Sequence, residues 1–119
     1  MKDATTPAVP PPLVIEDGIF FKVKNRYEKI RFADMLWVQA KDIYAIIRTT
    51  EARYLVSHSL GDVHQQLPDA LFERVHRSYV VNLTKIDAIE DRNLLVREEY
   101  IPVGDAYKEA LFQRLRFMP

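Results

Sequence analysis

The chain has 119 residues, 48 % of them hydrophobic and 29 % charged, which is the size and composition of one globular domain with its own core. Its 17 basic and 17 acidic residues cancel. A nucleic-acid interface, for which a basic domain is usual, would therefore depend on where the cations lie. Cysteine is absent, which excludes disulfides, thiolate nucleophiles and cysteine-ligated zinc and favours a cytoplasmic protein.

The first residues have a composition of their own. Pro7, Pro10, Pro11 and Pro12 are four of the seven prolines and precede any apolar periodicity. Because consecutive prolines favour an extended, semi-rigid spacer, we assign residues 1–17 to a proline-rich linker or tail and residues 18–119 to one domain. No apolar run approaches the ~20 residues that span a bilayer, and no secretion signal is predicted, so no membrane partner is expected.

The domain is predicted to be mainly β. Short runs rich in β-branched and aromatic residues, separated by polar turns, are typical of strands. The first two runs flank Asn25-Arg26, which resembles a hairpin connection, and Ala40-Lys41-Asp42 separates the next two. The expected strands are 19–24, 27–32, 35–39, 43–49, 53–57, 86–90, 93–97 and 100–103, together with a central run described below.

Two helices are expected. A short internal helix begins after Ser59, which stands three residues before Asp62 as in a capping box, and Pro68 ends it. A short C-terminal helix begins at Gly104-Asp105, because apolar residues recur every four positions from 107 to 115.

The longest β-rich run, residues 72–83, is predicted to be a single central strand. Arg74, His76 and Arg77 lie within it, although an unpaired charge is costly to bury. One interpretation is a half-buried strand whose basic residues lie at its solvated N-terminal end. The other is that these three side chains face an anionic partner, while residues 79–83 anchor the strand in the core.

No catalytic constellation is found. His76 and Ser78 would share one face of a strand, but no nucleophile-elbow sequence accompanies them. The histidines, which include His58 and His64, lack the spacing of a zinc site, and the three glycines form no phosphate loop. We therefore predict no enzymatic activity, no metal and no cofactor.

The cations indicate a possible binding surface. Those at positions 22, 24, 26, 29 and 31 alternate with apolar residues, which is typical of a solvated sheet face balanced by nearby acids. Lys41, Arg77, Arg92 and Lys108 fall instead in turns, at a strand end or at a helix start. Cations held in this way on a rigid sheet can reach phosphates and guanine edges. From the residues alone, a solvated surface and a nucleic-acid interface both remain open.

The central run resembles the core motif of LytTR domains, which are the DNA-binding output domains of LytR/AlgR/AgrA-type bacterial response regulators. It reads Phe72-x-Arg74-Val75-His76-Arg77-Ser78-Tyr79-Val80-Val81-Asn82-Leu83-x-x-Ile86. Other segments match the family in order: Asp34-Met35-Leu36-Trp37-Val38-Gln39-Ala40 followed by Tyr44-x-x-Ile47, then Ser59-Leu60-x-x-Val63-x-x-x-Leu67-Pro68, then Ile101-Pro102-Val103 followed by Tyr107-Lys108. The resemblance covers roughly residues 18–117.

The resemblance implies an elongated, mostly antiparallel β fold with one short internal helix and a short C-terminal helix. It implies sequence-specific binding of duplex DNA through loops and strand ends rather than through a recognition helix. Arg77 would contact a base or a phosphate, and the lysines and Arg92 mainly phosphates. The DNA-binding positions expected from it are Lys41, Asp42, His76, Arg77, Arg92, Gly104, Asp105 and Lys108.

Asp105 departs from the family pattern, because many members carry a basic residue at about this position. An aspartate there repels phosphate unless it is paired. The alternative is that Asp105 caps the final helix and that Tyr107 and Lys108 take over the DNA contact.

The expected function is that of the output domain of a bacterial transcriptional response regulator, tethered to a phospho-receiver domain absent from this chain. The isolated domain is expected to be monomeric and weakly binding, and dimeric on repeated DNA half-sites, where tethering raises affinity. The alternative is a protein-interaction module on the same β fold, with Asp105 and an exposed Trp37 or Phe117 facing a protein. Salt separates the two, because DNA binding releases counterions.

Overall fold

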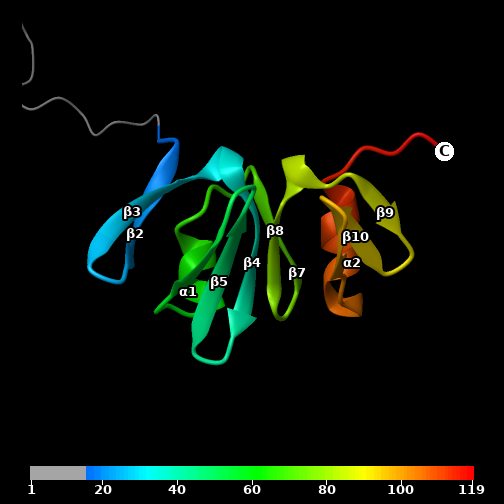
Figure 1. Ribbon diagram of the computed structural model, residues 1–119. Coiled ribbons are helices and arrows are strands. Elements are labelled where there is room, and N and C mark those ends of the chain that lie inside the picture. The colour runs from blue at the N-terminus through cyan, green and yellow to red at the C-terminus, as the bar shows by residue number, and fades with distance from the viewer. Residues whose placement is uncertain (1–15) are drawn as a thin grey trace, which may run out of the picture.

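The computed structural model describes residues 16–119 as an elongated molecule with extents of 59 × 41 × 25 Å. Figure 1 shows three parts in a row: an N-terminal hairpin, a central sheet with a short helix, and a C-terminal sheet beside a second helix. The hairpin consists of β2 (Gly18–Val23) and β3 (Arg26–Arg31). The expected elongated, mainly β fold with two short helices is confirmed.

The central sheet has five antiparallel strands in the order β6-β5-β4-β8-β7. They are β4 (Met35–Lys41), β5 (Tyr44–Thr49), β6 (Arg53–Val56), β7 (Phe72–His76) and β8 (Tyr79–Asn82). β4 lies in the middle, and its residues 35–38 are all buried. Burial on both faces explains why this stretch of sequence is continuously apolar instead of alternating. A β-bulge between Met35 and Trp37 lets Leu36 and Trp37 face the same side.

Two buried clusters cover the opposite faces of this sheet. The first joins the β2–β3 hairpin and α1 (Leu60–Gln65) to one face, and it includes Phe21 and Val80. The second joins the C-terminal region to the other face, and it includes Val81 and Leu111. Val80 and Val81 are consecutive and enter different clusters, as the alternation of side chains along a strand requires. The central strands therefore hold the two ends of the molecule together.

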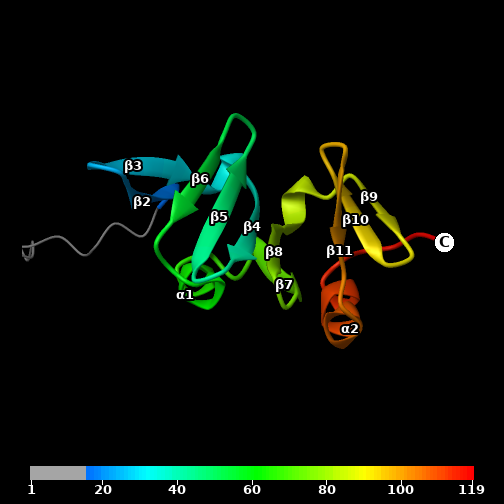
Figure 2. The ribbon, with the colours of Figure 1, turned by 60° about the horizontal axis from the view of Figure 1, so that its bottom comes forward.

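The C-terminal part is a second antiparallel sheet with a helix packed beside it. Its strands are β9 (Ala88–Glu90), β10 (Asn93–Val96) and β11 (Glu99–Pro102), in the order β11-β10-β9, and α2 (Asp105–Gln113) follows (Figure 2). Arg114, just after α2, donates hydrogen bonds to the carbonyls of Phe72 (3.1 Å) and Asp69 (2.6 Å) and pairs with Glu73 (2.6 Å). This arginine fastens the end of α2 to the start of β7.

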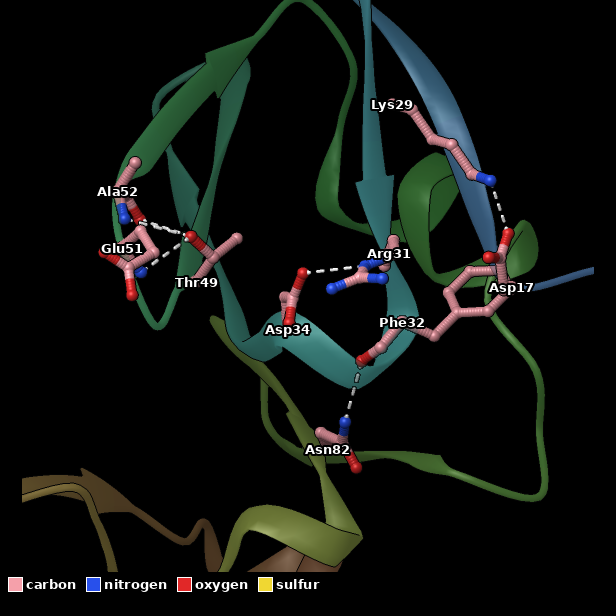
Figure 3. Close-up of polar contacts among 9 residues, drawn as sticks. All are labelled: Asp17, Lys29, Arg31, Phe32, Asp34, Thr49, Glu51, Ala52 and Asn82. Carbon is pink, nitrogen blue, oxygen red and sulfur yellow. Dashed lines mark hydrogen bonds and ion pairs between the residues drawn. The ribbon is translucent and has the colours of Figure 1, made fainter.

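Asn82 is a buried polar residue whose side chain makes four hydrogen bonds. Its side-chain amide donates to the backbone carbonyls of Phe32 (3.1 Å) and Met35 (3.0 Å), and its side-chain oxygen accepts from the backbone amide (3.0 Å) and hydroxyl (2.7 Å) of Thr84. Phe32 begins the short 3-10 turn η1 (Phe32–Asp34) between β3 and β4, and Figure 3 shows Asn82 directed at it. Asn82 is 1 % exposed, and its two buried bonds, to Phe32 and Met35, tie β8 to that turn.

The predicted single strand over residues 72–83 is wrong. The chain reverses at Arg77–Ser78, so β7 and β8 form a hairpin in which His76 lies opposite Tyr79, with a bulge between Arg74 and His76. Neither turn residue has a positive φ. The turn therefore needs no glycine or asparagine, and its composition gave no signal of a reversal.

Smaller differences concern the turns. The first hairpin turns at Lys24-Asn25, where Lys24 has a φ of 58°, instead of at Asn25-Arg26. The connection between β4 and β5 is Asp42-Ile43 instead of the expected Ala40-Lys41-Asp42, so Lys41 is the last residue of β4 and not a turn residue. Lys24 and Ile43, which the sequence pattern places in strands, therefore lie in turns. For β4 and β5, the two-residue connection is the commonest kind in hairpins.

The helix caps are partly as expected. Ser59 caps α1, and its hydroxyl accepts from the Asp62 amide at 3.1 Å. The N-cap of α2 is Gly104, and Asp105 is the first helical residue, so Asp105 is not the cap. Trp37 is 3 % exposed and cannot face a protein partner. Most of the predicted linker, residues 1–15, lies outside the described residues.

Candidate nucleic-acid interface

The β7–β8 turn is braced by its own side chains. The Arg74 guanidinium donates to the backbone carbonyls of His76 (3.0 Å) and Arg77. His76 Nδ1 accepts from the Ser78 amide at 3.0 Å, and its ring lies edge-on to Tyr79 at 5.8 Å. With Nδ1 acting as acceptor, the proton of the neutral imidazole is on Nε2, which is the nitrogen left to donate to a ligand. The turn thus holds an exposed Arg77 on a fixed backbone.

The β4–β5 turn lies beside it. The Ala40 amide donates to the Ser78 carbonyl at 2.9 Å, which joins the end of β4 to the β7–β8 turn. Lys41 and Tyr44 are opposite each other, and Asp42 between them has a φ of 56°, a conformation that aspartate tolerates. Ile43 follows at the outer end of the turn and is 76 % exposed.

Two further segments continue the same line. The Gly104 amide donates to the Val75 carbonyl (2.8 Å), and the Val103 amide donates to the Arg92 carbonyl (2.8 Å). These bonds place the start of α2 beside β7, and the β9–β10 turn beside the start of α2. Figure 1 shows the β4–β5 turn, the β7–β8 turn and the N-terminal end of α2 on one side of the molecule. We call the surface formed by residues 40–44, 76–79, 91–92 and 103–108 the turn edge.

All eight residues expected from the resemblance therefore lie on one continuous surface, but their side chains differ in availability. Within residues 16–119, no ion pair involves Lys41 or Arg77. Arg92 pairs with Asp105 at 3.3 Å, and both side chains are largely exposed. The Lys108 ammonium lies 5.5 Å from the centre of the Phe112 ring, over the second turn of α2. The Asp105 carboxylate, which would repel phosphate, is thus neutralised by Arg92 of the same surface.

The structure disagrees with one of the two interpretations left open for Arg74, and the sequence did not single out Ile43. Arg74 was grouped with His76 and Arg77 as a side chain facing an anionic partner, but its guanidinium is directed at turn carbonyls. The alternation of residues along a strand does not predict that two backbone carbonyls converge on the Arg74 side chain. Ile43 was assigned to the start of a strand, and only the position of the reversal reveals that it lies at an exposed tip.

Other kinds of site receive no support from the described residues. In residues 16–119, no cluster of histidine, cysteine, aspartate or glutamate has the arrangement of a metal site. In the same range, no helix has the length and apolar character needed to cross a membrane. Outside the turn edge, a hydrogen bond with the Glu90 carboxylate raises the pKa of the exposed Tyr100.

Comparison with known proteins agrees with this geometry. The family model of the LytTr DNA-binding domain matches residues 25–116. Sensory transduction protein LytT of Bacillus subtilis (strain 168) is 33 % identical over 84 residues, which are 66 % of this chain and 35 % of that protein. The heme-containing CO-sensing transcriptional regulator RcoM 1 of Paraburkholderia xenovorans is 37 % identical over 60 residues, 50 % of this chain and 22 % of that protein.

A solved structure supports the same relationship. The LytTr DNA-binding domain of a putative methyl-accepting/DNA response regulator from Bacillus cereus superposes with a TM-score of 0.73 at 25 % identity, covering 86 % of this chain and 99 % of that one. The chain spans about a third of the length of the LytT relative, 35 %, so the comparison concerns this domain and not a whole regulator. The chain belongs to the LytTr DNA-binding domain family.

Proposed function

We propose that the chain is the DNA-reading part of a bacterial transcriptional regulator and that it binds duplex DNA through the turn edge. The observation that carries this is the row of backbone hydrogen bonds from Ala40 to Ser78, Gly104 to Val75 and Val103 to Arg92. A row of fixed turns can enter successive grooves, and its cations can replace counterions on phosphates.

The side chains of the turn edge suit different parts of a duplex. Arg77 offers a planar pair of donors to a guanine edge or a phosphate. Lys41 and Lys108 supply point contacts to phosphates, and His76 offers Nε2–H. Arg92 is paired with Asp105 at 3.3 Å and reaches a phosphate when it leaves that pair. The Gly104 amide is already bonded to Val75. We therefore assign Gly104 the role of letting the DNA backbone approach closely. A Cβ at this position would also stand 3.1 Å from Tyr107 Cδ2.

The arrangement of the whole regulator is part of the proposal. One matched relative is named a sensory transduction protein, and the matching region is 35 % of its length. We infer a phospho-receiver domain tethered to this chain, a cytoplasmic location, and two such domains on repeated half-sites. The chain alone is then a weakly binding monomer, and sedimentation at micromolar concentration should find one copy. A stable dimer in that experiment would contradict this part.

The test is selection of bound duplexes from a random pool, followed by affinity measurements on the winners at two salt concentrations. A recovered repeat is expected. With three phosphate contacts, from Lys41, Arg77 and Lys108, the affinity should fall about 40-fold between ~50 mM and ~200 mM salt, because each contact releases counterions. Recovery of no motif, with weak and salt-insensitive binding, would contradict DNA reading.

That contrary result would favour a protein-interaction module. Phe117 and Met118 at the C-terminal end are 51 % and 94 % exposed, and they could contact a protein. An apolar interface of this kind responds little to salt, which is why the same measurement separates the two functions.

A further inference from the structure

We propose that Ile43 recognises the 5-methyl group of a thymine in the major groove, an inference that rests on the proposed DNA binding. Ile43 is 76 % exposed and belongs to neither buried cluster. It is the apolar residue at the outer end of the β4–β5 turn, which reaches the lowest point of the molecule in Figure 1. Its exposure therefore has no explanation in the packing of the domain.

The turn presents this side chain rigidly. Lys41 and Tyr44 pair across the base of the turn, and the Ala40 amide is bonded to the Ser78 carbonyl at 2.9 Å. Isoleucine is branched at Cβ and has few χ1 rotamers. A contact made by a stiff side chain on a fixed hairpin loses little conformational entropy, so even a small apolar contact adds to affinity.

The surroundings of Ile43 indicate what it contacts. Charged Lys41 and Asp42 precede it, Tyr44 follows it and is 38 % exposed, and Arg77 lies on the neighbouring turn, so the tip is an apolar side chain beside charged groups and one aromatic ring. The major groove admits a two-stranded β-ribbon, and the apolar group that base edges display there is the thymine methyl. Phosphates and sugars offer this side chain no comparable partner. The combination suits direct contact with a base edge.

The test uses uracil, which differs from thymine only by the missing methyl. Each thymine of the selected duplex is replaced in turn, and the affinity of each duplex for the 119-residue protein is measured. At one thymine per half-site, replacement should weaken binding about fourfold, the fold-change that corresponds to ~0.8 kcal/mol for one buried methyl group. Ile43→Ala should bind the thymine and uracil duplexes equally at that position.

Phe20→Ala is the matched control, because Phe20 is another exposed apolar residue, 63 % exposed, on the N-terminal hairpin. This variant should keep the full preference for thymine. Equal binding of the wild type to every uracil duplex, or a selected motif without thymine, would overturn the role of Ile43 and leave DNA binding intact. Failure to select any duplex would contradict both the role of Ile43 and the proposed DNA binding. The failure of the Ile43 proposal alone is thereby distinguished from the failure of DNA binding.

Discussion

The N-terminal hairpin and the turn edge are both rich in cations but use them differently. In the hairpin region Arg26 pairs with Glu28 (2.6 Å), Lys29 with Asp17 (2.6 Å) and Arg31 with Asp34 (3.1 Å). Figure 3 shows the last two pairs. Among the described residues, the turn edge has one ion pair, Arg92 with Asp105 at 3.3 Å.

This difference shows why a net charge of zero does not argue against DNA binding here. Acids pair with three of the cations of the hairpin region, Arg26, Lys29 and Arg31, and reduce the field that extends beyond that surface. Within residues 16–119, Lys41 and Arg77 form no ion pair, and their charge is available to phosphates. The hairpin instead contributes apolar residues such as Phe21 and Ile30 to the first buried cluster. Its function in the domain is structural.

The largest expected effect is on stability and comes from Asn82, which holds the connection between the hairpin and the sheet. Asn82→Ala removes one donor from each of the buried carbonyls of Phe32 and Met35, of which Phe32 keeps the Met35 amide, and we expect the free energy of unfolding to fall by about 3 kcal/mol. Chemical denaturation measures this. Thr84→Ala, which removes one hydroxyl from the same network, should cost less. An unchanged midpoint for Asn82→Ala would show that the network is not needed.

The next effect concerns DNA affinity and tests the comparison directly. Arg77→Ala should weaken binding to the selected duplex by about 2 kcal/mol, since it removes a positioned guanidinium. Arg26→Ala is the matched control on the hairpin, where an ion pair already occupies the side chain, and it should change affinity by less than about 0.5 kcal/mol. Equal losses for the two variants, measured by fluorescence anisotropy, would mean that the turn edge is not a distinct surface.

Much of the fold follows from local patterns. The strand runs, the Ser59 cap and the two helices are where periodicity and capping chemistry place them. The reversal at Arg77–Ser78 is not, because Arg74 and His76 stabilise this turn with side-chain hydrogen bonds, while the residues of the turn itself are ordinary for a strand. A turn held by side-chain hydrogen bonds between residues two or three positions apart leaves no signature of glycine, asparagine or proline.

The candidate site was predictable in position but not in arrangement. The resemblance indicated Lys41, Arg77 and Asp105 at separate points of the sequence, and their common surface depends on pairing between strands distant in the chain. The ion pair of Asp105 with Arg92 joins the first residue of α2 to the β9–β10 turn. Such contacts arise from the packing of the C-terminal part against β7, which no local pattern encodes.

A smaller effect is expected from the one ion pair on the turn edge. Asp105→Asn should release Arg92 for a phosphate and tighten binding by about 0.5 kcal/mol, the scale of an exposed pair. The salt dependence should steepen by up to ~0.9 in the logarithmic slope, equivalent to one added phosphate contact. Asp34→Asn releases Arg31 beside the hairpin in the same way and should leave both quantities unchanged. Weaker binding by Asp105→Asn would mean that the carboxylate itself contacts the DNA.

The smallest effect is a titration at the hairpin. A hydrogen bond from the Lys29 ammonium holds the pKa of the exposed Asp17 below its usual value, so Lys29→Met should raise that pKa toward the value of an isolated aspartate. Carboxyl NMR over an acid titration measures it. Because the folded pKa is the lower one, the pair stabilises the fold above the unfolded pKa, and that contribution is lost as the pH falls through the folded value. DNA affinity near neutral pH should not change. The contrary result is that Lys29→Met alters DNA affinity and leaves the pKa of Asp17 unchanged. Lys29 would then contact DNA and would not pair with Asp17.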